Sequence, residues 1–111
     1  MQDLLTSALD PRSVAIIGAS DNIHKIGGRP IYYMQRHGYT GTIYPVNPAR
    51  DEIQGCKSYG SISALPEVPD LALVVVGGDK TLAAVEECAA RGVKSAVIIA
   101  SGFGETGAEG L

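Results

Sequence analysis

The sequence predicts an α/β fold in which a parallel sheet carries helices on both faces. Short apolar segments alternate with helix-compatible segments, the apolar segments are nearly continuous, and Gly or Pro separates the two kinds. Strands buried on both faces have this continuous apolar character, and right-handed crossovers bring their carboxyl ends to one edge. The expected strands are residues 14–17, Thr42–Val46, residues 71–76 and residues 94–100.

Helices are expected between recognisable start and stop signals. A short helix over residues 4–9 ends before Asp10 and Pro11, because a residue that precedes proline disfavours helical geometry. The next helix begins near Arg29 and Pro30, where proline suits the first turn, and ends at Gly38.

The last helix is expected over Lys80–Arg91, with Asp79 as its N-cap and Gly92 after its end. Cys88 lies within it and is expected to be a buried small residue, as free cysteines usually are. The predicted inner face consists of Leu82, Ala83, Val85, Ala89 and Ala90.

Between the second and third strands, residues 49–69 form a looser stretch. A short helix over residues 61–65 and a short edge strand over residues 56–58 are expected there. The chain stops after its last strand in a Gly-containing segment. We therefore expect residues 1–111 to be one domain, the N-terminal fragment of a larger protein, whose doubly wound sheet can lack its last strand.

Composition and charge exclude several classes of protein. No window approaches the roughly 18 apolar residues of a membrane span, and the N-terminus lacks a basic signal-peptide start, so we expect a cytoplasmic protein without a membrane partner. Residues 1–60 carry six Lys/Arg against five Asp/Glu, and residues 61–111 carry three against seven. Without a basic stripe, nucleic acid is not an expected partner. Cys56 and Cys88 lack metal-ligand spacing, so no metal is expected.

Four loops follow the strand carboxyl ends, where open α/β sheets bind their ligands. They are residues 18–28, 47–50, 77–79 and 101–105. In the first, Ser20 and Ile23 replace the second and third glycines of the Gly-x-Gly-x-x-Gly pattern. Ser20 and nearby amides can donate to a phosphate, Gly27 and Gly28 let the backbone approach a ligand, and Lys25 adds a positive charge. The alternative is that the glycines only turn the chain and Lys25 is solvated.

The second loop lacks the acid that holds the ribose hydroxyls of NAD. Asn47 stands in its place and Arg50 follows. This pattern argues against NAD, but an arginine suits the extra phosphate of NADP or the ribose 3′-phosphate of coenzyme A. The alternative for Arg50 is an ordinary surface arginine.

Further motifs follow in a fixed order: residues 11–20, 38–41, 43–48, Gly55 and Tyr59, residues 65–66, 69–72, 92–94 and 101–107. Together they resemble the CoA-binding domain of the NDP-forming acyl-CoA synthetases. That family includes ADP-forming acetyl-CoA synthetase and is related to the α subunit of succinyl-CoA synthetase. The resemblance covers nearly the whole chain.

The resemblance implies a Rossmann-like sheet that binds coenzyme A along its strand carboxyl ends. Lysine is usual at the position of Arg50 in chains similar to succinyl-CoA synthetase, and Val-Pro is usual where Gly77 and Gly78 stand here. Together, the resemblance and the loop pattern give these expected cofactor contacts: Gly18, Ala19, Ser20, Asp21, Asn22, Ile23, Lys25, Val46, Asn47, Pro48, Arg50, Val76, Gly77, Ile99, Ala100 and Ser101.

No catalytic residue is expected in this chain. Members of the family work through a phosphorylated histidine and a nucleotide-grasp domain that follow this region, whereas His24 and His37 have no orienting partner in the sequence pattern. We therefore expect a fragment that holds coenzyme A and is inactive alone, within a ligase that joins an acid to CoA using ATP or GTP. Its expected partners are the remaining domains or subunits, and a further copy of itself.

Three alternatives stay open at this stage. The domain can be a regulatory CoA-binding domain of a protein acetyltransferase, because some related chains are fused to one. It can be an NAD(P)-binding module, against which the absent acid and the interrupted glycine pattern weigh. It can also be a ligand-free remnant of the fold.

Overall fold

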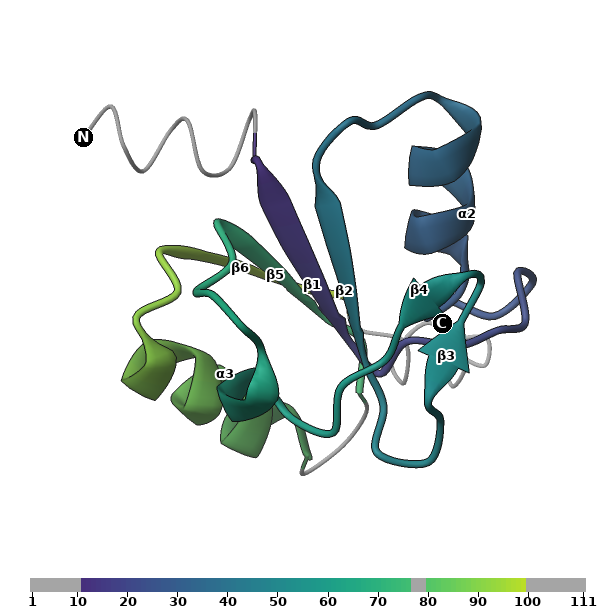
Figure 1. Cartoon of the computed structure of the whole chain (residues 1–111). Coiled ribbons are helices and arrows are strands. Elements are labelled where there is room, and N and C mark those ends of the chain that lie inside the picture. Colours follow the sequence, from purple (N-terminus) through teal and green to yellow (C-terminus); the bar gives the residue numbers. More distant parts are fainter. Residues whose placement is uncertain (1–10, 77–79, 100–111) are drawn as a thin grey trace.

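The computed structural model describes residues 11–76 and 80–99 (Figure 1). Its sheet has four parallel strands in the order β2-β1-β5-β6, so the α/β parallel-sheet prediction is confirmed. The elements are β1 (Ser13–Ile17), α2 (Arg29–Arg36), β2 (Thr42–Val46), β3 (Glu52–Ile53), β4 (Cys56–Lys57), the 3-10 helix η1 (Ile62–Ala64), β5 (Leu71–Val74), α3 (Lys80–Arg91) and β6 (Ser95–Ile98). The expected helix over residues 4–9 and the N-cap Asp79 lie outside the described residues.

The central strand β1 divides the core into two layers. Its five residues are all buried, and alternate side chains point to opposite faces. Val14 and Ile16 pack with Ile31 of α2 on one face. Ala15 and Ile17 pack on the other face, in the cluster that includes residues of η1 and α3. Figure 1 accordingly shows α2 and α3 on opposite sides of the sheet, as expected from the sequence.

The stretch after β2 forms a small hairpin that the sequence only partly predicts. β3 and β4 pair antiparallel, and Gln54 (φ 49°) and Gly55 (φ 83°) form the two-residue turn between them. Positive φ at both central residues is the geometry that matches the twist of a hairpin. The expected edge strand at residues 56–58 is therefore β4, and its partner is β3 rather than a strand of the main sheet.

Helix α3 has the expected bounds but a different inner face. Ala84 and Cys88 are its buried residues, whereas Leu82 is 66% exposed. These two buried residues lie four positions apart, one turn from each other, on the face toward η1 and β5, whereas Ala83, Ala89 and Ala90 are exposed. The prediction of Leu82, Ala83, Val85, Ala89 and Ala90 as the inner face is therefore wrong, and that of a buried Cys88 is confirmed.

The remaining boundaries differ from expectation by a few residues. The third strand ends at Val74 rather than at residue 76, and β6 is shorter than residues 94–100. The helix expected over residues 61–65 is the 3-10 turn η1. Within the described ranges, none of the helices has the length and apolar character that crossing a membrane requires.

Candidate functional site

Two hollows open where the loops after β1 and β2 meet. The first hollow, of about 540 Å³, is lined by Gly18, Ala19, Ser20, His24, Lys25, Ile26, Gly27, Asn47 and Val75. The second hollow, of about 500 Å³, is lined by Ser20, Asp21, Asn22, Lys25, Asn47 and Arg50. They adjoin each other, because Ser20, Lys25 and Asn47 line both. The structure thus brings together the expected phosphate-binding residues of both loops.

The loop after β1 is held in shape by its own backbone. The Ser20 amide donates to the Gly27 carbonyl (3.2 Å), and the Asn22 amide donates to Ser20 Oγ (3.0 Å). Among the described residues, the amides of Ala19, Asp21, Ile23, Ile26 and Gly27 find no acceptor. All but Ile23 line one of the hollows, so four amides and the Ser20 hydroxyl hydrogen are the donors that remain there for a bound anion.

Gly27 and Gly28 make close contacts within this loop. A Cβ atom at Gly27 would lie 2.1 Å from the Gly18 carbonyl oxygen, and one at Gly28 would lie 2.1 Å from the Asn22 carbonyl oxygen. The two glycines thus let the loop fold against itself. Gly27 also lines the first hollow, and the expectation that the two glycines let the backbone approach a ligand stays a prediction.

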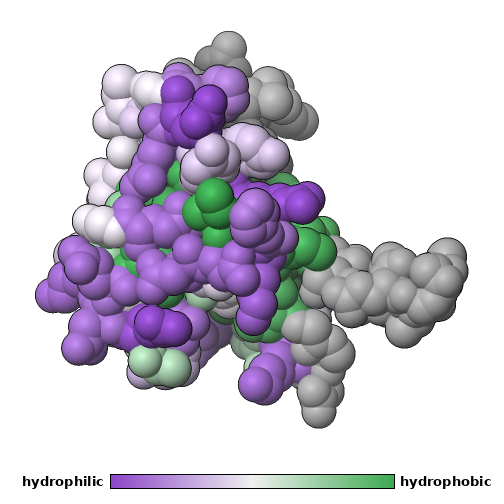
Figure 2. Space-filling model, turned by 90° about the vertical axis from the view of Figure 1, so that its right-hand side faces the viewer, coloured by the Kyte–Doolittle hydropathy of each residue, from purple (hydrophilic) through white to green (hydrophobic). Residues whose placement is uncertain are grey.

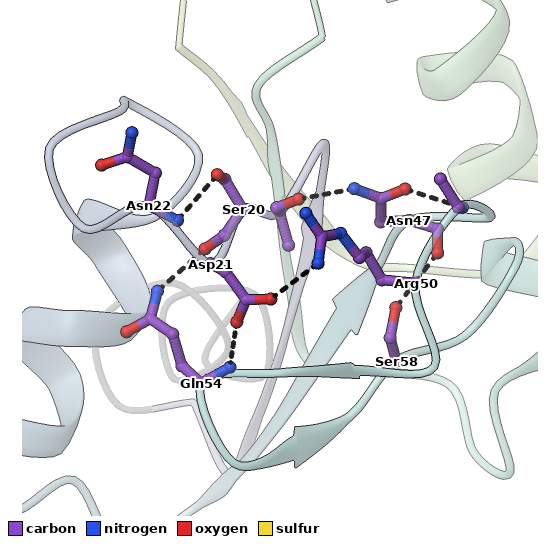
Figure 3. A network of polar contacts seen from close by, with 9 residues as sticks. Ser20, Asp21, Asn22, Asn47, Arg50, Gln54 and Ser58 are labelled. Carbon is purple, nitrogen blue, oxygen red and sulfur yellow. Dashed lines mark hydrogen bonds and ion pairs between the residues drawn. The ribbon is translucent and has the colours of Figure 1, made fainter.

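Asn47 braces the two loops against each other. Its Nδ2 donates to the Ala19 carbonyl (3.0 Å), and its Oδ1 accepts from the Ala49 amide (2.9 Å). Ser58 Oγ donates to the Asn47 carbonyl (3.1 Å) from below the loop (Figure 3). Both ends of the side-chain amide are therefore occupied, so Asn47 shapes the hollows more than it offers donors to them.

Arg50 crosses from the second loop toward the first. Its Nη1 lies 3.5 Å from Asp21 Oδ2, and both side chains are largely in solvent, with 61% and 41% of their areas exposed. An exposed pair of this kind is weak, so the guanidinium stays available to a stronger anion. With Lys25, the second hollow carries two cations against one carboxylate.

Gln54 belongs to this site although the sequence analysis did not single it out. Its Nε2 donates to the carbonyls of Ser20 (2.9 Å) and Gly28 (3.0 Å), and its amide donates to Asp21 Oδ1 (2.7 Å). Figure 3 shows the hairpin turn lying directly against the loop after β1. The sequence does carry a signal for this turn. Gln54 is followed by Gly55, and the two lie between short segments that each contain one polar and one apolar residue.

Comparison with known protein families identifies the chain. Residues 12–109 match the family described as CoA binding domain, which is most of the sequence. The chain belongs to this family of CoA-binding domains. The family prediction and the prediction of coenzyme A as the cofactor are thereby confirmed.

Individual relatives agree. The CoA-binding domain is 42% identical over 100 residues to acetate–CoA ligase (ADP-forming) II of Archaeoglobus fulgidus, covering 90% of this chain and 15% of that protein. It is 40% identical over 103 residues to a trans-feruloyl-CoA synthase of an unknown prokaryotic organism, covering 93% and 15%. The chain thus spans about a sixth of the length of these curated relatives.

A solved structure shows the same fold. The dinucleotide forming acetyl-coenzyme A synthetase 1 of Ca. Korarchaeum cryptofilum, in complex with phosphate and ADP, superposes with a TM-score of 0.83 at 39% identity. The match covers 95% of the CoA-binding domain and 23% of that chain. The Rossmann-like fold prediction is therefore confirmed.

Other expected contact residues of the CoA-binding domain lie around the hollows rather than in them. Val46 is 5% exposed and packs in the core, and Val76 and Ile99 are partly buried against the two core layers. Ile23 and Pro48 flank the loops without lining either hollow. The expected residues Gly77, Ala100 and Ser101 lie outside the described residues, as do the loops at 77–79 and 101–105.

Proposed function

We propose that this domain binds coenzyme A across the two adjoining hollows, as the CoA-binding part of an NDP-forming acyl-CoA ligase. The diphosphate lies over the loop after β1, near Ser20 and Lys25. The ribose 3′-phosphate lies in the second hollow beside Arg50. The pantetheine arm follows the first hollow past Val75. One observation carries the proposal: two cations and four unused amides belong to residues that line the hollows adjoining at the carboxyl ends of β1 and β2.

The domain holds coenzyme A and leaves the chemistry to other parts of the ligase. Among the described residues, no group of three or more His, Cys, Asp or Glu side chains could hold a metal ion. His24 and His37 are both exposed, and the described contacts include none that would orient either ring as a phosphoryl acceptor. The domain therefore supplies binding and orientation, and the partners we propose for it are the remaining domains or subunits of the ligase.

The acid that is joined to CoA is selected outside this domain. The acetate–CoA ligase and the trans-feruloyl-CoA synthase use acids of very different size, yet this chain is 42% and 40% identical to them. The part that the three proteins share is thus suited to their common substrate, coenzyme A. This supports a role in cofactor binding rather than in substrate choice.

Calorimetric titration with CoA, NADH and NADPH tests the cofactor assignment. We expect binding of CoA and no comparable response to either nicotinamide nucleotide. Tight binding of NADPH without a CoA response would overturn the proposal and favour an oxidoreductase module. The absence of any ligand-induced rise in melting temperature would favour a ligand-free remnant.

A thermodynamic cycle tests the role of Arg50. Wild type and Arg50→Ala are each titrated with CoA and with dephospho-CoA, which lacks the 3′-phosphate. If Arg50 holds that phosphate, the substitution weakens CoA binding by about tenfold and leaves dephospho-CoA binding unchanged. Lys57→Ala is the matched control, because Lys57 is an exposed cation on β4 that faces the Tyr59 ring. Equal losses for both ligands would remove Arg50 from the phosphate site.

A further inference from the structure

The hairpin turn grips the loop after β1 at two separated points. Gln54 Nε2 donates to the Ser20 carbonyl near the start of the loop and to the Gly28 carbonyl at its end. The Gln54 amide adds a third bond, to the carboxylate of Asp21. One residue of the hairpin thus spans the loop that provides the amides of the proposed phosphate site.

The backbone conformation of Gln54 is strained, so these hydrogen bonds form at a cost in conformational free energy. Its φ of 49° lies in the left-handed region, where glycine, asparagine and aspartate are the usual residues of such turns. A glutamine gains nothing locally from this conformation. Its side chain, however, has the reach and the two donor hydrogens needed for both carbonyls. The strained conformation is consistent with a residue retained for what its side chain holds.

The hydrogen bonds of Gln54 are also linked to Arg50, the cation of the second hollow, through Asp21. Asp21 accepts the Gln54 amide with Oδ1 and faces Arg50 with Oδ2 (Figure 3). The turn therefore fixes the carboxylate against which Arg50 rests. Figure 2 shows that the outer surface on the side bearing α2 and the hairpin is mostly hydrophilic. Beneath it, Ile53 of the hairpin is buried in the same apolar cluster as Ala19, so the polar contacts of Gln54 add to an apolar contact between hairpin and loop.

We propose that Gln54 is a positioning residue, which holds the loop of residues 18–28 in the shape that receives coenzyme A. The inference rests on the proposed function. Gln54 does not line either hollow, so it acts through the loop and touches no ligand itself. Preorganising a loop reduces the ordering cost of binding, and losing that preorganisation weakens binding without removing a contact.

Three substitutions separate this role from a purely structural one. Gln54→Glu keeps the length of the side chain but removes both donor hydrogens, and Gln54→Ala removes the side chain. Gln54→Gly also removes it and at the same time relieves the positive-φ strain. Each variant is titrated with CoA, and its melting temperature is measured. Amide hydrogen exchange of residues 18–28 is followed without ligand.

We expect all three variants to bind CoA about tenfold more weakly and to exchange the loop amides faster. Gln54→Gly should melt at or above the temperature of Gln54→Ala while binding no better, which uncouples affinity from stability. Gln35→Ala is the matched control, because Gln35 donates to the Gln54 carbonyl (3.0 Å) but makes no described contact with the loop. It should keep wild-type affinity and loop exchange.

Unchanged loop exchange in Gln54→Glu would overturn the proposed grip, whatever the ligand does. Two results would show that Gln54 has only a structural role. One is a CoA affinity that falls in parallel with the melting temperature across the variants, and the other is an equal loss of CoA affinity in Gln35→Ala. A wild-type protein that does not bind CoA would overturn the proposed function instead, and the exchange measurement would still decide whether Gln54 holds the loop.

Discussion

Asp21 Oδ2 lies 3.5 Å from Nη1 of Arg50, across the second hollow of the site. This carboxylate opposes anion binding in a hollow that also carries Lys25. The pair gives Arg50 a fixed resting position while coenzyme A is absent. A phosphate that enters must compete with this carboxylate for the guanidinium.

Asp21→Asn should therefore strengthen CoA binding. The amide oxygen can still accept from the Gln54 backbone, but the negative charge beside Arg50 is gone. Because exposed ion pairs contribute at most about 1 kcal/mol, we expect a gain of up to about fivefold, smaller at high salt. Calorimetry at two salt concentrations measures it. A marked loss of affinity would instead indicate that the carboxylate itself contacts the ligand.

Gly28→Ala should destabilise the protein and weaken CoA binding. The new Cβ would lie 2.1 Å from the Asn22 carbonyl oxygen, so the loop backbone must move. Forcing an extra methyl into such a close contact costs about 1–3 kcal/mol of unfolding free energy, which urea denaturation measures. Gly60→Ala is the control, because its Cβ would meet open space and its φ is not positive. Similar losses in both variants would contradict this account.

Tyr44→Phe should remove an alkaline transition in stability. Burial, followed by the hydrogen bond to Glu67 and the charge of that carboxylate, raises the pKa of Tyr44 from 10.0 to about 12. The unfolded chain therefore releases this proton at lower pH than the folded one. The stability that the protonated phenol contributes is complete below pH 10 and is lost between pH 10 and about 12.

Urea denaturation of wild type and Tyr44→Phe at a series of pH values between 8 and about 12 measures this contribution. The variant should be less stable at pH 8 by about 0.5–1.5 kcal/mol, the usual value of one hydrogen bond, and the difference should shrink as pH rises. Tyr33→Phe is the control, because the Tyr33 side chain is 52% exposed. A difference that stays constant with pH would show that the pKa of Tyr44 is the same in the folded and in the unfolded chain.

The two cysteines should differ in reactivity. Burial raises the pKa of both the Cys56 and the Cys88 thiols, but Cys88 is 2% exposed whereas Cys56 is partly exposed. At pH 8, iodoacetamide should modify Cys56 slowly and leave Cys88 unmodified until the protein unfolds. Mass spectrometry of the native and urea-treated protein measures this. Equal rates in the native state would place Cys88 at the surface and contradict the observed face of α3.

The sheet could be predicted from the sequence because its strands are continuous apolar runs. Residues 14–17 and Thr42–Val46 have no other stable position than a buried parallel sheet, and the loops that follow them then meet. The grouping of Ser20, Lys25 and Arg50 around one hollow followed from that topology alone. Family resemblance supplied the ligand, which the topology does not name.

The packing of α3 could not be predicted in the same way. Its sequence has apolar residues on every side, so periodicity does not select a face. The inner face consists of Ala84 and Cys88, and the equally small Ala83, Ala89 and Ala90 are exposed, so residue size does not identify the face either. Gln54 was missed for a related reason, because its bonds join residues 26 to 34 positions apart and depend on how the hairpin folds back.

Tyr59 occupies the outer edge of β2 near its carboxyl end. Its amide donates to the Pro45 carbonyl (2.9 Å) and its carbonyl accepts from the Asn47 amide (2.8 Å), so the chain after β4 already lies along the outer side of β2. Pro45 has no backbone hydrogen to offer there in any case. An added strand would need the same backbone groups, so Tyr59 excludes it from the carboxyl end of β2.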